Sequence, residues 1–358
     1  MKILFIGIDP TTTGGVQTFT KNIASFVDNN VGYIPSFISS NTKTNKNVIS
    51  LLPASIIAKI FLRILRLLQL DSKLFNLLLS RKIRQEHYNL IILNTPQTLK
   101  LLTSIQIPIV LVQHQTFDTY IKRSDYFNAE LKLIDLVKKR LTKLVVLSPL
   151  DREEFIKKLN IEESKLCAIR HTTNLEILTS NKIENHKLLI LCRIDNKHKR
   201  LDLAVKAMKL LPTYELSIYG DGPDKEYIQG VIDSEKITNV TLYPSNNDIK
   251  EILDNHSIHI MTSDFEGYPL ANIEAMRRGL PLIIRNTFTS AKDIIENNGV
   301  LLDSNWSDKE FCDAVTLITA NFSIYSNNAL SMSKKYDYEV IKNKWLTLFD
   351  EIVTREIN

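Results

Sequence analysis

Cysteine is scarce in this sequence, and acidic metal-binding pairs are missing. The three cysteines, Cys167, Cys192 and Cys312, are odd in number and widely spaced, so they fit no zinc or redox motif. We therefore expect reduced, buried thiols in a cytosolic protein. An Asp-x-Asp pair that would bind a metal ion occurs nowhere in the chain. The sequence accordingly predicts neither a metal site nor a cofactor.

Three other patterns are absent. The dinucleotide fingerprint G-x-G-x-x-G is missing, although Gly14 and Gly15 follow the first predicted strand. No apolar stretch reaches the length of a membrane span. The apolar run within residues 1–10 is too short for a signal peptide and fits a first strand better. These absences favour a cytoplasmic location.

The chain is long and carries its charge unevenly. Its 358 residues are enough for two domains, and the hydrophobic content of 44% favours globular cores over disorder. Residues 1–180 hold 24 Lys and Arg against 14 Asp and Glu, a net +10, whereas residues 181–358 hold 21 against 26, a net −5. We expect the basic half to face a membrane surface, a nucleic acid or a phosphorylated acceptor. Nucleic acid is the least favoured because no base-stacking aromatic pattern accompanies the basic residues.

Apolar, β-rich segments alternate with helical ones along the chain, which is the pattern of an α/β fold with doubly wound sheets. A first domain is predicted over residues 1–170 and a second over residues 187–339, joined by a polar linker at 171–186. The strands predicted in the first domain lie at residues 2–8, 89–93, 108–113, 141–147 and 165–170. Those predicted in the second lie at residues 187–192, 214–219, 239–243, 257–262, 281–284 and 299–302.

The most informative stretch is 263–276, where a predicted strand leads through a loop into a helix. Pro269 suits the first turn of that helix, Gly267 allows a sharp turn before it, and Gly279 ends it. The free N–H groups at such a helix start attract anions or polar groups. Because bare carboxylates repel phosphate, we expect Glu266 and Glu274 to accept hydrogen bonds from sugar and ribose hydroxyls. The alternative is an ordinary loop with a solvated Glu and a capping Glu.

This stretch resembles the signature of retaining glycosyltransferases of family 4, in which two Glu are separated by seven residues. The resemblance continues through Ile-Glu-Ala-Met into Arg-Arg-Gly-Leu-Pro. It implies the GT-B fold, two Rossmann-like domains whose parallel sheets face each other across a cleft. It also implies that Glu266 and the loop hold the donor sugar, while Glu274 holds the ribose of the nucleotide. The loop residues concerned are Gly267, Tyr268, Pro269 and Leu270.

Two cations follow the predicted strand at 187–192. Arg193 and Lys199 would suit a diphosphate, and they resemble the Arg and Lys with which the family stabilises its leaving nucleotide. A run of charges usually faces solvent, but Arg193 directly follows a buried strand, which makes a solvated position less expected. Lys197 is a second candidate, and the following Arg-Leu-Asp-Leu favours Lys199.

Further matches lie at strand ends, where ligands bind in open α/β sheets. His114 resembles the family histidine that approaches the donor sugar, although a structural histidine is the alternative and Gln115 stands where Gly or Asn is usual. Gly14 and Gly15 match positions near the donor phosphate and acceptor, or form a plain turn. The nucleobase is expected at Tyr243 and Ser245, although Gly is usual in place of the Pro-Ser pair.

Residues 41–84 are strongly basic, with nine Lys and Arg and a single acidic residue. A helix is predicted over 55–70, with Lys59, Arg63 and Arg66 on one face and apolar residues around most of the rest. A basic amphipathic helix of this kind lies in a bilayer interface. The alternative is a core helix with one solvated stripe. Family members dock to membranes through such a helix, so we expect residues 55–84 to contact an anionic membrane.

Together these features predict a retaining, metal-independent hexosyltransferase. It would move a hexose from a nucleotide-diphosphate sugar, expected to be a UDP-sugar, to a glycan or lipid-linked acceptor hydroxyl in cell-surface polysaccharide or glycoconjugate synthesis. We expect it in the cytoplasm, peripheral on the inner face of the membrane. Its last helix, at about 340–358, would pack back on the first domain. The alternatives are a sugar-nucleotide epimerase and a non-catalytic carbohydrate-binding or partner protein.

Overall fold

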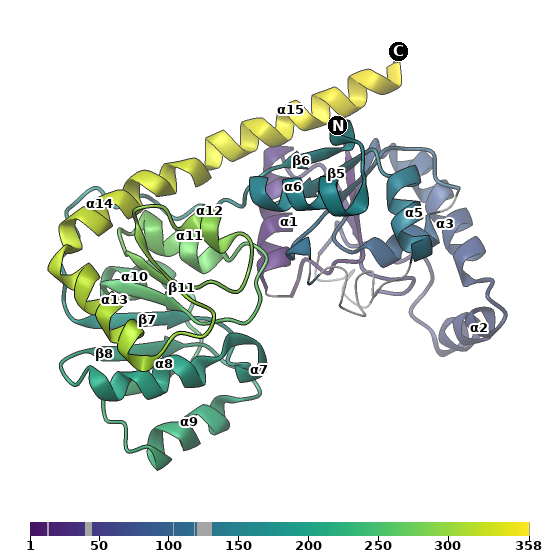
Figure 1. Ribbon diagram of the computed structural model, residues 1–358. Coiled ribbons are helices and arrows are strands. Elements are labelled where there is room, and N and C mark those ends of the chain that lie inside the picture. Colours follow the sequence, from purple (N-terminus) through teal and green to yellow (C-terminus); the bar gives the residue numbers. More distant parts are fainter. Residues whose placement is uncertain (13, 40–44, 103, 118, 120–130, 358) are drawn as a thin grey trace. The chain divides into compact units, whose positions relative to one another are not determined.

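The computed structural model describes residues 1–12, 14–39, 45–102, 104–117, 119 and 131–357. The chain divides into two compact units (Figure 1). The first unit comprises Met1–Arg170 and Ile341–Asn358, and the second comprises His171–Val340. Each unit is built on a six-stranded sheet whose strands pair in parallel. Within the described residues, no helix is long and apolar enough to span a bilayer.

The sheet of the first unit has the strand order β2-β1-β3-β4-β5-β6. Because β1 pairs with both β2 and β3, Ile3 lies opposite Val31 on one side and Leu90 on the other. The strands are β1 (Ile3–Ile6), β2 (Val31–Ile34), β3 (Leu90–Leu93), β4 (Ile109–Val112), β5 (Lys143–Val146) and β6 (Leu166–Ala168). Its helices are α1 (Gly15–Phe26), α2 (Ile56–Leu67), α3 (Asp71–Glu86), α5 (Leu131–Arg140) and α6 (Pro149–Leu159).

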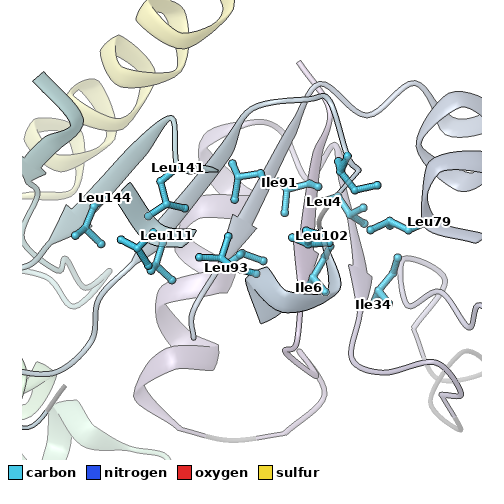
Figure 2. Close-up of a cluster of buried hydrophobic side chains, with 14 of the residues drawn as sticks. Leu4, Ile6, Ile34, Leu79, Ile91, Leu93, Leu102, Leu111, Leu141 and Leu144 are labelled. Carbon is cyan, nitrogen blue, oxygen red and sulfur yellow. The ribbon is translucent and has the colours of Figure 1, made fainter. Parts of the chain in front are cut away.

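The core of the first unit explains why its strands read as unbroken apolar runs. Helices cover both faces of a parallel sheet, so successive residues of β1 and β3 are all buried. Figure 2 shows Leu4, Ile6, Leu93 and Leu111 converging from three neighbouring strands with Leu79 of α3. This two-sided burial is what allowed the strands to be predicted from composition.

The sheet of the second unit has the order β12-β11-β10-β7-β8-β9. Its strands are β7 (Lys187–Leu191), β8 (Glu215–Tyr219), β9 (Val240–Tyr243), β10 (Ile258–Met261), β11 (Leu282–Arg285) and β12 (Gly299–Leu302). The surrounding helices are α7 (Asn196–Lys199), α8 (Leu201–Ala207), α9 (Lys225–Ser234), α10 (Ile249–Asp254), α11 (Leu270–Arg277), α12 (Ala291–Ile294), α13 (Asp308–Ala320) and α14 (Phe322–Ser333). The chain order reverses between β7 and β10, which makes their carboxyl ends the expected ligand-binding edge.

The last helix, α15 (Tyr338–Ile357), contributes to the core of the first unit. Trp345 is fully buried, and its ring lies 5.7 Å from that of Phe19 on α1. Lys143 at the start of β5 pairs with Glu351 at 3.4 Å. The first unit is therefore completed by a segment that follows the second unit in sequence.

Several features differ from the sequence-based expectations. The elements that were not individually predicted are β2, α3, α5, α7, α9, α10, α12, α13 and α14, and α8 gives way to a 3-10 helix at Met208–Leu210. The three cysteines are free, but they are half-buried instead of buried. The core-helix alternative for α2 is wrong, because only Ala58 and Leu62 are buried along its length.

The contact of α15 with the first unit gives a test of the fold. Trp345→Ala removes a large side chain from a closed core, which typically costs about 3–5 kcal/mol. We expect urea unfolding of the first unit to shift accordingly. Val353→Ala on the same helix, where the side chain is 36% exposed, should cost less than about 1 kcal/mol. Equal effects of the two changes would show that α15 does not belong to this core.

Candidate active site

The candidate site lies in the second unit, at the edge where β7 and β10 end. These strands are neighbours, with Leu188 opposite Ile258 and Leu189 opposite His259. Parallel strands end at the same edge, so the segments 192–199 and 262–269 leave the sheet side by side. Arg193 and Lys199 lie on the first segment, and Glu266 lies on the second.

Lys199 and Glu266 form an ion pair across these two segments. Their side chains are only 16% and 12% exposed, and the Ser263 hydroxyl donates a hydrogen bond to the same Glu266 oxygen at 2.7 Å. Thr262 Oγ1 donates to the Lys199 carbonyl at 2.8 Å, which fixes the backbone beneath the pair. The exposed Lys197 takes no part in it. The structure thus places Lys199, the favoured one of the two lysines, beside Glu266.

A stacked pair of rings holds the same two segments together. The His198 ring lies 3.9 Å from the Phe265 ring at an interplanar angle of 10°. His198 Nε2 bonds to the Phe265 carbonyl at 2.5 Å, and the Asp264 amide donates to the His198 carbonyl at 2.9 Å. Burial lowers the pKa of His198, so the ring is mainly neutral at pH 7 and Nε2 carries the donated proton. Neither residue was predicted to belong to the site, although both lie within the sequence motifs.

A third link comes from β11. Arg285, at the end of that strand, pairs with Asp264 and donates from Nε to the Ser304 carbonyl at 2.7 Å. It is 9% exposed, so the carboxylate beside it stabilises a charge largely removed from water. Sequence reasoning missed Arg285 because no motif connects it with the loop it supports.

Arg193 has a fixed backbone and a free side chain. The amides of Cys192 and Ile194 donate to the carbonyls of Tyr219 and Asp221 at 3.2 and 3.0 Å. The expectation that Arg193 avoids a solvated position is wrong, because its side chain is exposed. The buried strand β7 does not prevent this, since it ends at Leu191, two residues before Arg193.

The turn Gly220-Asp221-Gly222-Pro223 lets this segment approach closely. A Cβ atom on Gly220 would lie 1.9 Å from the Cys192 carbonyl oxygen, and one on Gly222 would lie 2.1 Å from that of Ile194. Only glycine therefore allows the backbone around Arg193 to lie on the turn. The Gly-x-Gly-Pro element acts here as a support for the segment 192–194.

Hydrogen bonds to neighbouring elements fix the loop before α11. Tyr268 is buried, and its hydroxyl donates to Asp293 at 2.8 Å and bonds to the Tyr336 hydroxyl at 2.7 Å. The Gly267 carbonyl accepts a hydrogen bond from Ser290. The Tyr268 side chain thus faces the interior of the unit.

Two details of this loop differ from expectation. Pro269 occupies the N-cap position of α11, one residue before the predicted first turn, and Leu270 is the first helical residue. Gly267 does not adopt a positive φ, whereas Gly279 does, at 73°. The turn at Gly267 therefore does not require glycine for its backbone angles.

Glu274 lies on α11 in a different setting from Glu266. Its carboxylate accepts a hydrogen bond from Thr173 Oγ1 at 3.4 Å, and no cation of the described residues pairs with it. Burial raises the pKa of Glu274 to about 7, against a small lowering by Thr173. The two glutamates thus differ, because Lys199 neutralises Glu266 whereas the buried Glu274 accepts a hydrogen bond from a hydroxyl group.

Tyr243 and Ser245 lie where β9 ends. Tyr243 is 37% exposed and stacks on Tyr219 of β8, with ring centroids 4.5 Å apart and planes at 13°. The Ser245 amide and hydroxyl both bond to the Asp221 carboxylate, the amide at 3.0 Å. An exposed aromatic face and a fixed backbone turn are thus presented at the same edge.

The remaining candidates lie in the first unit. His114 follows β4 and is buried; its Nε2 bonds to Asn94 Oδ1 at 2.7 Å, and its ring meets that of Phe19 edge-on at 4.8 Å. Gly14 caps α1 with φ 151°, which favours glycine, whereas a Cβ on Gly15 would meet nothing within 4 Å. These contacts show how the residues are held, and a role toward a sugar remains a prediction.

The described residues contain no group of three or more His, Cys, Asp and Glu side chains placed to hold one metal ion. The charges at the β7–β10 edge include the Lys199–Glu266 and Arg285–Asp264 pairs, together with Arg193.

Known glycosyltransferases are similar in sequence to the second unit. The family model described as Glycosyl transferases group 1 matches residues 176–331. An uncharacterized glycosyltransferase of Haemophilus influenzae is 29% identical over 174 residues, 46% of this chain and 49% of that protein. The poly(glycerol-phosphate) alpha-glucosyltransferase of Bacillus subtilis is 26% identical over 181 residues, 48% of this chain and 26% of that protein. The match thus spans about half the length of the Haemophilus relative and about a quarter of the length of the Bacillus relative.

Solved structures show the same fold along the whole chain. The crystal structure of Anabaena HepE in complex with UDP-glucose is similar over 98% of this chain and 100% of that one, with a TM-score of 0.76 and 16% identity. The predicted GT-B architecture of two Rossmann-like units is therefore confirmed. The match of residues 176–331 to the Glycosyl transferases group 1 model confirms for that region the resemblance carried by Glu266 and Glu274.

The raised pKa of Glu274 predicts a pH effect on stability. A carboxyl that holds its proton more tightly when folded stabilises the second unit below about pH 4.5, and this contribution is lost as the pH rises through about 7. The full loss is about 3 kcal/mol. Glu274→Gln carries no charge, so its free energy of unfolding should exceed the wild-type value increasingly between pH 5 and pH 8.

Urea unfolding at the two pH values measures this difference. Glu176→Gln, at an exposed position of the same unit, should follow the wild type at both. Parallel pH profiles for the wild type and Glu274→Gln would show that Glu274 is not held protonated by burial.

Proposed function

We propose that this chain is a retaining glycosyltransferase of family 4 that moves a hexose from a UDP-sugar to an acceptor hydroxyl. The observation that carries this proposal is the Lys199–Glu266 pair at the point where the chain order of the sheet reverses. It lies within the residues that match the Glycosyl transferases group 1 model, with Arg193 on the same segment as Lys199. The HepE structure, which contains UDP-glucose, supports the choice of donor.

Each charged residue of the proposed donor site has a separate role. Lys199 and Arg193 would meet the diphosphate, whose negative charge grows as the bond to the sugar breaks. Glu266, already turned toward Lys199, would accept hydrogen bonds from the sugar. Glu274 would accept them from the ribose. The free side chain of Arg193 can turn onto the diphosphate because its backbone is fixed and its guanidinium has no competing partner among the described residues.

The nucleobase would lie against the exposed ring of Tyr243, next to the turn at Ser245. From the loop before α11, Gly267 and Leu270 would offer backbone amides to the sugar, since the Tyr268 side chain faces inward. Pro269, which has no N–H, would shape the loop between them. In the first unit, His114 is proposed to approach the donor sugar, with Gly14 and Gly15 near the phosphate and acceptor. The open space at Gly15 would let a ligand come close to the backbone.

Transfer with retention joins the acceptor oxygen to the face of the sugar that the diphosphate leaves. No protein nucleophile is assigned, and the cations take the part that a metal ion would otherwise play. An epimerase is less well supported, because Glu266 is engaged by Lys199 and is thus a poor acid or base. A non-catalytic protein would have little use for a half-buried ion pair that costs desolvation.

For the acceptor we propose a cell-surface polysaccharide or glycoconjugate. The Bacillus relative is named for a poly(glycerol-phosphate) acceptor and for an alpha-linked product, which fits retention from an α-linked nucleotide sugar. The net charge of +10 on residues 1–180 favours an acceptor that carries phosphate. The enzyme would work on the inner face of the cytoplasmic membrane, reached through residues 55–84.

The first kinetic prediction separates the roles of the charged residues. Arg193→Ala and Lys199→Ala should each lower kcat about 100-fold or more, because each removes a charge needed most in the transition state. Glu274→Ala should mainly raise the donor KM, because the ribose is the same before and during reaction. Glu266→Ala should lower kcat and also raise the donor KM. Steady-state rates with the donor varied at saturating acceptor measure these effects.

Lys197→Ala is the matched control, since this lysine lies in α7 with Lys199 and is exposed. It should keep wild-type kinetics. If Lys199→Ala behaves like Lys197→Ala, the diphosphate does not lie at Lys199 and the proposed site is wrong.

The second prediction concerns metal ions. With Arg193 and Lys199 serving the diphosphate, turnover should continue in excess EDTA. The measurement is UDP release with and without chelator, followed by manganese addition. A loss of activity that manganese restores would contradict the assignment of these cations.

A further inference from the structure

The helix α2 has three distinct stripes. At about 100° per residue, its buried side chains form one stripe and its cations the next. The third and widest stripe is apolar and exposed, with Ile57 at 80% and Leu67 at 84%. The full exposed apolar set on α2 and the residue after it is Ile56, Ile57, Ile60, Phe61, Ile64, Leu67 and Leu68. The cations therefore lie between the buried stripe and the exposed apolar one on one side of the helix.

A hollow of about 380 Å³ opens beside the cationic stripe. Residues 36–38 and Ala54 form one side of it, and α2 forms the other. Lys59, Arg63 and Arg66 all line this hollow. Its apolar lining, which includes Leu62, would keep part of a bound group away from water.

The three cations have no acidic counterpart. Residues 29–70 contain no Asp or Glu at all. Elsewhere in the described part of the chain, no carboxylate pairs with Lys59, Arg63 or Arg66, whereas Lys82 on the neighbouring helix α3 pairs with Glu86. Three like charges within two turns repel one another, so the hollow is poised for a compact anion.

The geometry points to a membrane lipid as the source of that anion: we propose that the hollow binds the terminal phosphate of a lipid while the exposed apolar stripe of α2 enters the bilayer. A helix in the interface buries its apolar face just below the headgroups, which brings an adjacent cationic stripe to the level of the phosphates. Two guanidinium groups and one ammonium supply enough donors for the oxygens of a phosphomonoester. A phosphodiester offers fewer charges and no free end to enter the hollow.

This site specifies the membrane contact proposed above and does not depend on sugar transfer. It is tested with the full chain and vesicles of phosphatidylcholine mixed with either phosphatidic acid or phosphatidylglycerol, adjusted to equal surface charge. Wild-type protein should bind the phosphatidic acid vesicles about tenfold more tightly, the effect of one additional charge-assisted hydrogen bond. Co-sedimentation measures both affinities.

Variants assign the preference to the hollow. Replacing Lys59, Arg63 and Arg66 together by Gln should remove the preference and weaken binding to phosphatidic acid about 100-fold, since each cation near an anionic surface contributes about fivefold. The matched control changes the exposed Lys73, Arg81 and Arg84 of α3 to Gln, which alters the net charge equally. The control should keep the preference.

Ile57→Ser with Leu67→Ser should weaken binding to both vesicle types and leave the preference intact, because these side chains are exposed and lie outside the hollow. Equal binding of wild-type protein to the two vesicle types would contradict the phosphate site but not the membrane contact. No binding to either type overturns the membrane contact as well. Sugar transfer to a soluble acceptor, measured in parallel, reports on the donor site independently of both results.

Discussion

The ion pair between Lys199 and Glu266 is the interaction on which the candidate site depends. Both side chains are largely withdrawn from water, so each charge needs the other, and removing one leaves the second buried and unpaired. The pair also joins two segments that are far apart in sequence but leave adjacent strands. The stacked rings of His198 and Phe265 and the Arg285–Asp264 pair hold the same junction, so the charged groups keep their positions without a ligand.

Around this fixed centre, the other two groups proposed to meet the donor are less constrained. Arg193 extends from a backbone pinned by the glycine turn at 220–222, and Glu274 keeps a carboxyl whose pKa is raised by burial to about 7. A binding hydroxyl or phosphate can engage such groups without breaking an existing ion pair. The first unit shows a similar contrast, with a rigid apolar core beneath α15 and an exposed, cationic and apolar α2.

Much of this organisation could be predicted from the sequence, because parallel strands covered on both faces appear as short apolar runs. The motif around Glu266 located the loop and its helix, and the residues after Lys199 chose it over Lys197. The contacts of Arg285 and of the His198 ring could not be predicted, since they depend on which strands are neighbours. The sequence could not decide whether α2 is exposed either, because an apolar helix can have the same composition in a core and on a surface.

The central claim is that the chain transfers a sugar from UDP with retention. The most direct measurement incubates the protein with UDP-glucose and UDP-N-acetylglucosamine in the presence of candidate phosphate-bearing acceptors, and follows UDP release and the anomeric configuration of the product by NMR. The account predicts UDP in equal amount to an α-linked product. A β-linked product, or an epimerised nucleotide sugar formed without UDP release, would contradict it.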